Sequence, residues 1–321
     1  MGPSARLRGT MRAAPLPVTV IGGYLGAGKT TLVNALLRRA NGTRLAVLVN
    51  DFGALPIDAD LILSPQGDPG SSDGDTLAIA GGCVCCSFGS ELIETMQALE
   101  KRAPRPDHVL VEASGVALPG GIAATVSLLS GYVVDGVVVL ADAETVRARA
   151  TDRYLGDTIE RQLADADLVL ATKTDLVDDA SRTETPDWLG ARGRTLDVRR
   201  GDVPFELLTG LRTDAPRAKG FSPAPHADYE SRAFDALGAL DVERLATGLA
   251  DPALGVLRAK GLLERADGTV AELHVVGRRA DVRDAASRAT PGRLVCIGLR
   301  GRLNAARIRT LIESLTCETT P

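Results

Sequence analysis

The sequence has few aromatic residues, few lysines and no long apolar run. Aromatic side chains make up 3% of the 321 residues, too few for a surface that binds nucleic-acid bases by stacking. The net charge of −4 provides no overall basic field, which also disfavours nucleic acid as a partner. No stretch approaches the roughly 20 consecutive apolar residues that a membrane-spanning helix needs. We therefore expect neither a nucleic-acid partner nor a membrane partner.

The cysteines are few and unevenly placed. There are five, and Cys83, Cys85 and Cys86 lie within four positions. A disulfide framework would distribute an even number of cysteines along the chain, so this pattern indicates a reducing compartment, the cytoplasm. The first 16 residues contain arginines but no apolar core, so we expect an arm and not a secretory signal, with translation starting at Met1 or Met11.

The first two thirds of the chain alternate between short β-branched runs and amphipathic helical stretches. Such alternation predicts a mostly parallel sheet with helices on both faces, the α/β class. Strands are expected at 18–21, 44–49, 76–80, 108–112, 133–141, 167–172 and 196–199. The sequence predicts helices at 31–39, 90–102 and 205–211.

A proline-rich stretch divides the chain. Residues 213–228 contain four prolines and little apolar content, which predicts a linker. Beyond it, strands are expected at 231–235, 256–264, 270–276 and 293–299, with helices at 242–249 and 304–315 and a hairpin turn at Asp267-Gly268. We therefore divide the chain into an arm (1–16), an α/β domain (17–212), the linker (213–228) and a smaller α+β domain (229–321).

The strongest motif follows the first expected strand. Gly23-Tyr-Leu-Gly-Ala-Gly-Lys-Thr30 fits the pattern G-x-x-x-x-G-K-[ST] between a strand and a helix. Glycines let backbone N–H groups turn around a phosphate, and the helix N-terminus adds positive potential. In this motif a lysine reaches the β- and γ-phosphates and a Ser or Thr hydroxyl binds Mg²⁺. The predicted nucleotide-binding residues are Gly23, Gly26, Ala27, Gly28, Lys29, Thr30 and Thr31.

Two acidic residues follow other expected strands. Glu112 ends the strand at 108–112, and Gly115 comes three residues later. Because the carboxyl ends of parallel strands face the ligand, Glu112 is a candidate for binding Mg²⁺ or positioning the attacking water, and Gly115 for donating its N–H to the γ-phosphate. Asp51 is a second candidate for the Mg²⁺ shell, on a loop suited to sensing the γ-phosphate. The predicted catalytic residues are thus Lys29, Glu112 and Asp51.

A third loop is a candidate base-binding site. Thr172-Lys-Thr-Asp175 follows a buried strand. A carboxylate at Asp175 suits the N1–H and N2–H₂ groups of guanine, and the stem of Lys173 can lie along the ring. The usual pattern is Asn-Lys-x-Asp, and the hydroxyl of Thr172 can tie loops together but lacks the two-ended hydrogen bonding of an amide. Guanine is favoured, and adenine or relaxed base choice stays open.

The three clustered thiols predict a transition-metal site. In extended chain, residues two apart point the same way, so Cys83 and Cys85 can face one ion while Cys86 turns in. Thiolates favour Zn²⁺ or Cu⁺ over Mg²⁺. Three ligands leave a position open, as a transferable ion requires. The alternatives are small buried side chains or a redox role.

The motifs together resemble those of the CobW-like P-loop GTPases, relatives of the HypB and UreG nickel chaperones. The resemblance covers nearly all of residues 17–316. The matching segments are 22–31, 49–53, 81–86, 112–115 and 172–175, with 240–245 and 257–261 in the second domain. This chain has Thr172 where the family has Asn, Asp51 where it usually has Glu, and Val49 where some members have Glu.

The resemblance implies a P-loop NTPase fold with a CobW-type C-terminal domain. It also implies a slow cytoplasmic GTPase that uses Mg²⁺ and delivers a transition metal to a client metalloprotein, with a homodimer as one possible state. Cys83, Cys85 and Cys86 would bind the metal, zinc or alternatively Co²⁺ or Ni²⁺. The alternatives are an ATP-dependent small-molecule kinase or synthetase, a non-catalytic metal or redox sensor, and, from the arginines at 278–309, a GTPase bound to nucleic acid.

Overall fold

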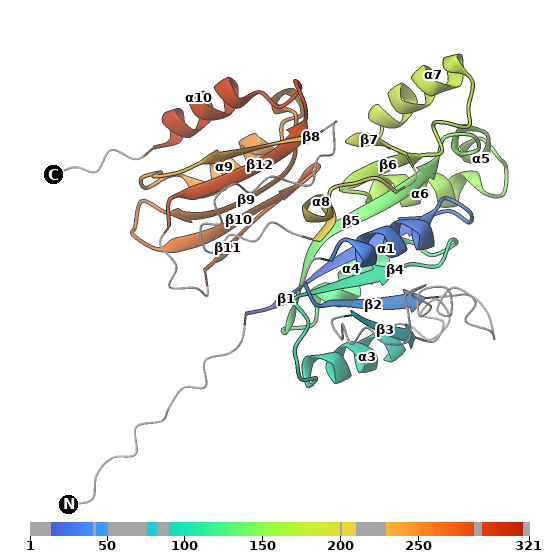
Figure 1. Ribbon diagram of the computed structural model, residues 1–321, viewed down its shortest axis with the longest axis horizontal. Coiled ribbons are helices and arrows are strands. Elements are labelled where there is room, and N and C mark those ends of the chain that lie inside the picture. Colours follow the sequence, from blue (N-terminus) through green and yellow to red (C-terminus); the bar gives the residue numbers. More distant parts are fainter. Residues whose placement is uncertain are drawn as a thin grey trace, which may run out of the picture.

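The computed structural model describes residues 14–40, 43–50, 76–81, 90–199, 201–209, 229–285 and 291–316. They form a seven-stranded sheet and, from residue 229 onward, a five-stranded sheet. Figure 1 shows the two sheets as neighbouring bodies, with the second sheet and its helices in orange and red. Among the described helices, none combines the length and the apolar composition that crossing a bilayer requires.

The first sheet is parallel throughout its described pairings. Its order is β3-β2-β4-β1-β5-β6-β7, so β1 lies at the centre between β4 and β5. The carboxyl ends of all strands therefore meet at one edge, and β1 is where the order reverses, the usual ligand position in such sheets. The strands are β1 (Leu16–Gly23), β2 (Leu45–Asn50), β3 (Thr76–Gly81), β4 (His108–Glu112), β5 (Tyr132–Asp142), β6 (Leu168–Thr172) and β7 (Thr195–Val198).

Helices cover both faces of this sheet. The strand interiors are continuous runs of Val, Leu, Ile and Ala because both faces are buried, and successive residues of β6 alternate between two apolar cores. One core is closed by α3 (Ser90–Glu100), α4 (Pro119–Ser127), α6 (Gly156–Asp165) and α7 (Asp179–Gly190), with α5 (Val146–Ala150) beside α6. The other is closed by α1 (Lys29–Arg38) and α8 (Phe205–Thr209). The α/β fold class is confirmed.

The second sheet is antiparallel, in the order β11-β10-β9-β12-β8. Its strands are β8 (Tyr229–Phe234), β9 (Val256–Glu264), β10 (Val270–Val276), β11 (Arg279–Asp284) and β12 (Arg293–Leu299). One face packs on α9 (Val242–Leu249) and α10 (Ala305–Leu315), and Cys296 is buried in that core. Gly268 has φ +80° at the predicted β9–β10 turn. The edge strand β11 was not predicted, because its sequence is mostly polar and half-exposed.

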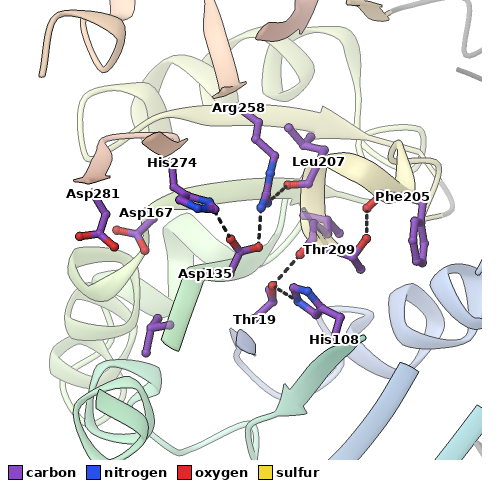
Figure 2. A network of polar contacts seen from close by, with 12 residues as sticks. Thr19, His108, Asp135, Asp167, Phe205, Leu207, Thr209, Arg258, His274 and Asp281 are labelled. Carbon is purple, nitrogen blue, oxygen red and sulfur yellow. Dashed lines mark hydrogen bonds and ion pairs between the residues drawn. The ribbon is translucent and has the colours of Figure 1, made fainter. Parts of the chain in front are cut away.

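The two sheets share an apolar core and a buried ion pair. Leu257 of β9 and Val276 of β10 pack into the core that α1 and α8 close. Figure 2 shows Arg258, from β9, bonded to Asp135 of β5 and donating to the carbonyl of Leu207 in α8 (2.8 Å). Arg258 is 2% exposed. Burial alone would raise the pKa of Asp135, but the charge and hydrogen bond of Arg258, together with the nearby His108 and His274, outweigh burial and hold that pKa well below its usual range.

A second buried bond lies beside this pair and links β1 to β4 and α8. Thr19 donates its hydroxyl to the carbonyl of Leu208 (2.6 Å) and lies 2.9 Å from His108 Nε2. Since the hydroxyl hydrogen is already used, Thr19 accepts from the imidazole, which carries its proton on Nε2. Burial lowers the pKa of His108 to about 4, so the ring is neutral at pH 7. Figure 2 shows His108 at the junction between the sheets, and His274 lies at the same junction.

We expect the Asp135–Arg258 pair to behave as a unit in stability measurements. Arg258→Met leaves a buried carboxylate without its partner and should lower the free energy of unfolding in urea by roughly 3–5 kcal/mol. Asp135→Asn combined with Arg258→Met removes both charges and should recover most of that loss. Arg300→Met, on an exposed arginine in the turn after β12, is the control. A double variant as unstable as Arg258→Met would contradict this account.

Candidate functional site

The turn between β1 and α1 forms a phosphate-binding loop. Gly26 and Gly28 have φ of +78° and +97°, in the left-handed region that favours glycine. Lys29, the first residue of α1, is largely buried and donates from Nζ to the carbonyls of Gly23 (2.9 Å) and Tyr24 (3.4 Å). The ammonium group is therefore held over the turn that the motif predicted.

Thr30 and Glu112 meet at the carboxyl edge of the sheet. The Thr30 hydroxyl donates to Glu112 Oε1 at 2.9 Å, and Glu112 is 2% exposed at the end of β4. The parallel pairing of Ile21 with Glu112 brings the two motifs together. A hydroxyl and a carboxylate are hard oxygen donors of the kind that Mg²⁺ selects, so the residues present fit the predicted ion.

A cavity of about 290 Å³ opens between these groups. Gly115 lines it from the loop after β4, and a Cβ at this position would lie 2.5 Å from the side chain of Leu25. Only glycine therefore fits where this loop meets the phosphate-binding turn. The cavity brings together Gly26, Gly28, Lys29, Thr30, Thr31, Glu112 and Gly115, all predicted site residues.

A second cavity, of about 230 Å³, lies on the other side of the same turn. Ala27, Gly28 and Thr31 line it together with Thr172, Lys173 and Asp175, the three predicted base-binding residues. The Thr172 hydroxyl donates to the carbonyl of Ala27 (2.9 Å), so it does tie the two loops together.

Lys173 has a fixed position beside this second cavity. Its backbone is left-handed, with φ 58°, and Nζ forms an ion pair with Asp142 Oδ2 at 2.9 Å. The neighbouring Thr174 bonds to Asp197 at 2.5 Å. These contacts hold the loop after β6, so the side chains of Lys173 and Asp175 are presented from a supported backbone.

Four predicted site residues lie outside the described residues. They are Asp51 and the three cysteines, Cys83, Cys85 and Cys86. Within the described part of the chain, no group of three or more His, Cys, Asp or Glu side chains is arranged to hold a metal ion. The transition-metal site therefore stays a prediction from the sequence.

Sequence reasoning did not identify Asp142, Asp197 or Gln162. Asp142 could have been found, because it directly follows a predicted strand, as Glu112 ends one. Asp197 lies within the last strand, and its role depends on the pairing of β6 with β7. Gln162 is buried in α6 and donates to the loop that contains Gly115 (3.1 Å). Nothing in the local sequence distinguishes it from an ordinary helical glutamine.

In comparisons with known proteins, each of the two parts of the chain matches a family model. Residues 17–192 match the family model "CobW/HypB/UreG, nucleotide-binding domain", and residues 229–316 match "Cobalamin synthesis protein cobW C-terminal domain". The zinc chaperone CobW of Sinorhizobium sp is 33% identical over 282 residues, covering 78% of this chain and 79% of that protein.

Two further similarities are more limited in coverage or closeness. The zinc-regulated GTPase metalloprotein activator 1 of Schizosaccharomyces pombe is 33% identical over 172 residues, which cover 51% of this chain and 40% of that protein. The crystal structure of Zn(II)-bound YjiA GTPase from E. coli aligns with a TM-score of 0.43 and 24% identity, over 94% of this chain and 99% of that one.

The contribution of the hydrogen bond between Thr172 and Ala27 to the free energy of unfolding should be measurable. Thr172→Val keeps the shape of the side chain but leaves the buried carbonyl of Ala27 without this donor, at a cost of about 1–2 kcal/mol in the free energy of unfolding. Thr125→Val, on a half-buried threonine of α4 whose hydroxyl donates within its own helix, is the matched control. Equal effects of the two substitutions in urea denaturation would argue against the structural role of Thr172.

Proposed function

The chain belongs to the CobW/HypB/UreG family, and from that premise we propose that it binds and hydrolyses GTP with Mg²⁺ and delivers zinc to a client metalloprotein in the cytoplasm. The observation that carries the nucleotide part is the convergence of Lys29, Thr30 and Glu112 on one cavity, with the base-binding loop on the other side of the same turn. The zinc part is supported by the names of several relatives.

Each end of the nucleotide has its own set of residues. The backbone N–H groups of residues 26–31 and the ammonium of Lys29 bind the phosphates, and Gly115 donates its N–H to the γ-phosphate. At the other end, Asp175 accepts from N1–H and N2–H₂ of guanine, while the stem of Lys173 lies along the ring. The ion pair with Asp142 keeps Lys173 in place for this contact.

Thr30 and Glu112 hold Mg²⁺, with Asp51 as a further ligand from the loop after β2. When bound, the ion neutralises charge that develops on the phosphate oxygens during hydrolysis. Glu112 also positions the attacking water, because its buried carboxylate lies at the edge of the phosphate cavity. Lys29 stabilises the same negative charge from the opposite side, so removal of either group slows hydrolysis.

The transported ion is bound by Cys83, Cys85 and Cys86. These residues begin two positions after Gly81, the last residue of β3. The pairings of β3 with β2 and of β2 with β4 place that strand end at the same edge as Glu112. Zn²⁺ is the expected ion, with Co²⁺ and Ni²⁺ as alternatives.

Nucleotide and metal then influence each other through one edge of the sheet. The loop at Asp51 and the segment after Glu112 respond to the γ-phosphate, and the thiol segment lies between them in the sequence. Hydrolysis would change the affinity for the metal or for the client protein. The client receives the ion directly, and the acting species is a monomer or a homodimer.

Single substitutions at the two ends of the nucleotide should give different results. Lys29→Ala removes the phosphate-binding cation and should abolish GTP turnover, while the exposed Lys101→Ala leaves it unchanged.

Asp175→Asn removes the acceptor for guanine and should weaken GTP binding at least tenfold, while favouring XTP, whose base has a carbonyl in place of the amine. Asp187→Asn is the matched control on an exposed aspartate. Preference of the wild type for ATP would instead favour the kinase or synthetase alternative.

Metal and nucleotide affinities should be reciprocally linked. GTP should change the Zn²⁺ dissociation constant by the same factor, about 5–150-fold for typical coupling, by which Zn²⁺ changes that of GTP. Calorimetric titration of the purified chain with Zn²⁺, Co²⁺ and Ni²⁺ measures this factor. Substituting serine for Cys83, Cys85 and Cys86 should abolish it, whereas Cys317→Ser should not. Identical Zn²⁺ affinities with GTP, with GDP and without nucleotide would reject the coupling.

A further inference from the structure

A buried glutamine in α6 holds the loop that follows β4. Gln162 is 2% exposed, and its Nε2 donates to the carbonyl oxygens of Gly115 (3.1 Å) and Ala117 (2.8 Å). A side-chain amide has two N–H bonds, and here both serve the same loop. A polar group buried in this way is costly unless its hydrogen bonds are made, so the contact fixes the loop relative to α6.

The next turn of α6 holds the far end of the same loop. Asp165 Oδ2 accepts from the backbone N–H of Gly120 at 2.9 Å, where α4 begins. A Cβ on Gly120 would lie 2.6 Å from the Asp165 carboxyl carbon, so a side chain at this position would displace the carboxylate. Gln162 and Asp165 therefore support the loop at three points between residues 115 and 120.

On its other side the loop lies directly against the phosphate-binding turn. A Cβ on Gly115 would lie 2.8 Å from the backbone nitrogen of Leu25, and one on Gly22 would lie 2.8 Å from Pro119 Cγ. The backbone of Gly115 thus packs on Leu25 in the turn, and the Pro119 ring packs on Gly22 near the end of β1, with no room for a methyl group on either glycine. Gly115 also lines the cavity, so the position of the loop helps to define the shape of the cavity.

The carboxyl end of α6 is itself anchored by the second sheet. The turn between β10 and β11 approaches so closely that a Cβ on Gly277 would lie 1.7 Å from the carbonyl oxygen of Asp167. Arg278 donates its backbone N–H to the same oxygen (3.1 Å), and its guanidinium donates to the backbone carbonyl of Ala164. Because this end of α6 is fixed, the helix acts as a rigid support for Gln162.

We propose that Gln162 is a positioning residue for GTP hydrolysis, which places the Gly115 loop at the terminal phosphate through hydrogen bonds to Gly115 and Ala117. The inference rests on the proposed function, in which Gly115 contacts the γ-phosphate. GDP lacks that phosphate, so its binding is independent of the position of the loop. Loss of the support should therefore weaken the binding of GTP but not that of GDP, whereas general damage to the cavity should weaken the binding of both nucleotides.

The test substitutes methionine for Gln162 in the full-length chain. Methionine keeps the length of the side chain and suits a buried site, but it has no N–H donor. With Mg²⁺ present, Gln162→Met should lower kcat for GTP at least tenfold and weaken binding of a non-hydrolysable GTP analogue several-fold. GDP affinity should stay within twofold of the wild type. The exposed Gln97→Met on α3 is the matched control.

A second variant keeps the test decisive if Gln162→Met does not fold. Asp165→Ala, at a half-buried position, releases the N–H of Gly120 and should lower kcat two- to fivefold, again without a change in GDP affinity. Wild-type kcat in the folded variants, or equal losses of GTP-analogue and GDP affinity, would overturn the positioning role. Absence of GTP turnover in the wild type would overturn the proposed function itself, so the two failures are distinguishable.

Discussion

The parallel pairing of β1 with β4 is the constraint on which the site depends. It brings the end of β4 beside the phosphate-binding turn, so that Thr30 on α1 bonds to the buried carboxylate of Glu112. Without this register, Glu112 would not meet the lysine and the hydroxyl, which are neighbours on the turn. The same pairing carries the Gly115 loop to the turn, where only glycine fits against Leu25. The proximity of Lys29, Thr30, Glu112 and the Gly115 loop is thus a consequence of strand order.

The second sheet contacts the opposite end of the first. Arg258 bonds to Asp135 near the start of β5, and the β10–β11 turn contacts Asp167 just before β6. Among the described residues, none from the second sheet lines either cavity at the carboxyl edge. In the described part of the chain, the second sheet is thus connected to these cavities through the first sheet. Helix α6 is one physical route, because its end touches that turn while Gln162 holds the Gly115 loop.

Much of the fold follows from local patterns, and the exceptions have clear physical reasons. Continuous apolar runs predict the buried strands, and the Asp-Gly pair predicts the β9–β10 turn. The edge strand β11 has no such signal, because its polar residues are half-exposed and its pairing with β10 is a long-range property. For the site, Gly-Lys-Thr and the strand-end acid were sufficient to predict the phosphate cavity. Gln162 and Asp197 were not identifiable, since their contacts depend on which strands and helices become neighbours.

Hydrogen–deuterium exchange of the intact chain tests the central claim most directly, because it locates the nucleotide without any substitution. Exchange is compared without nucleotide, with Mg²⁺ and GDP, and with Mg²⁺ and a non-hydrolysable GTP analogue. Both nucleotides should slow exchange in residues 25–31 and 173–176, and the triphosphate alone should add protection in residues 113–117. Protection confined to the junction between the sheets, with none at the phosphate-binding turn, would contradict the account.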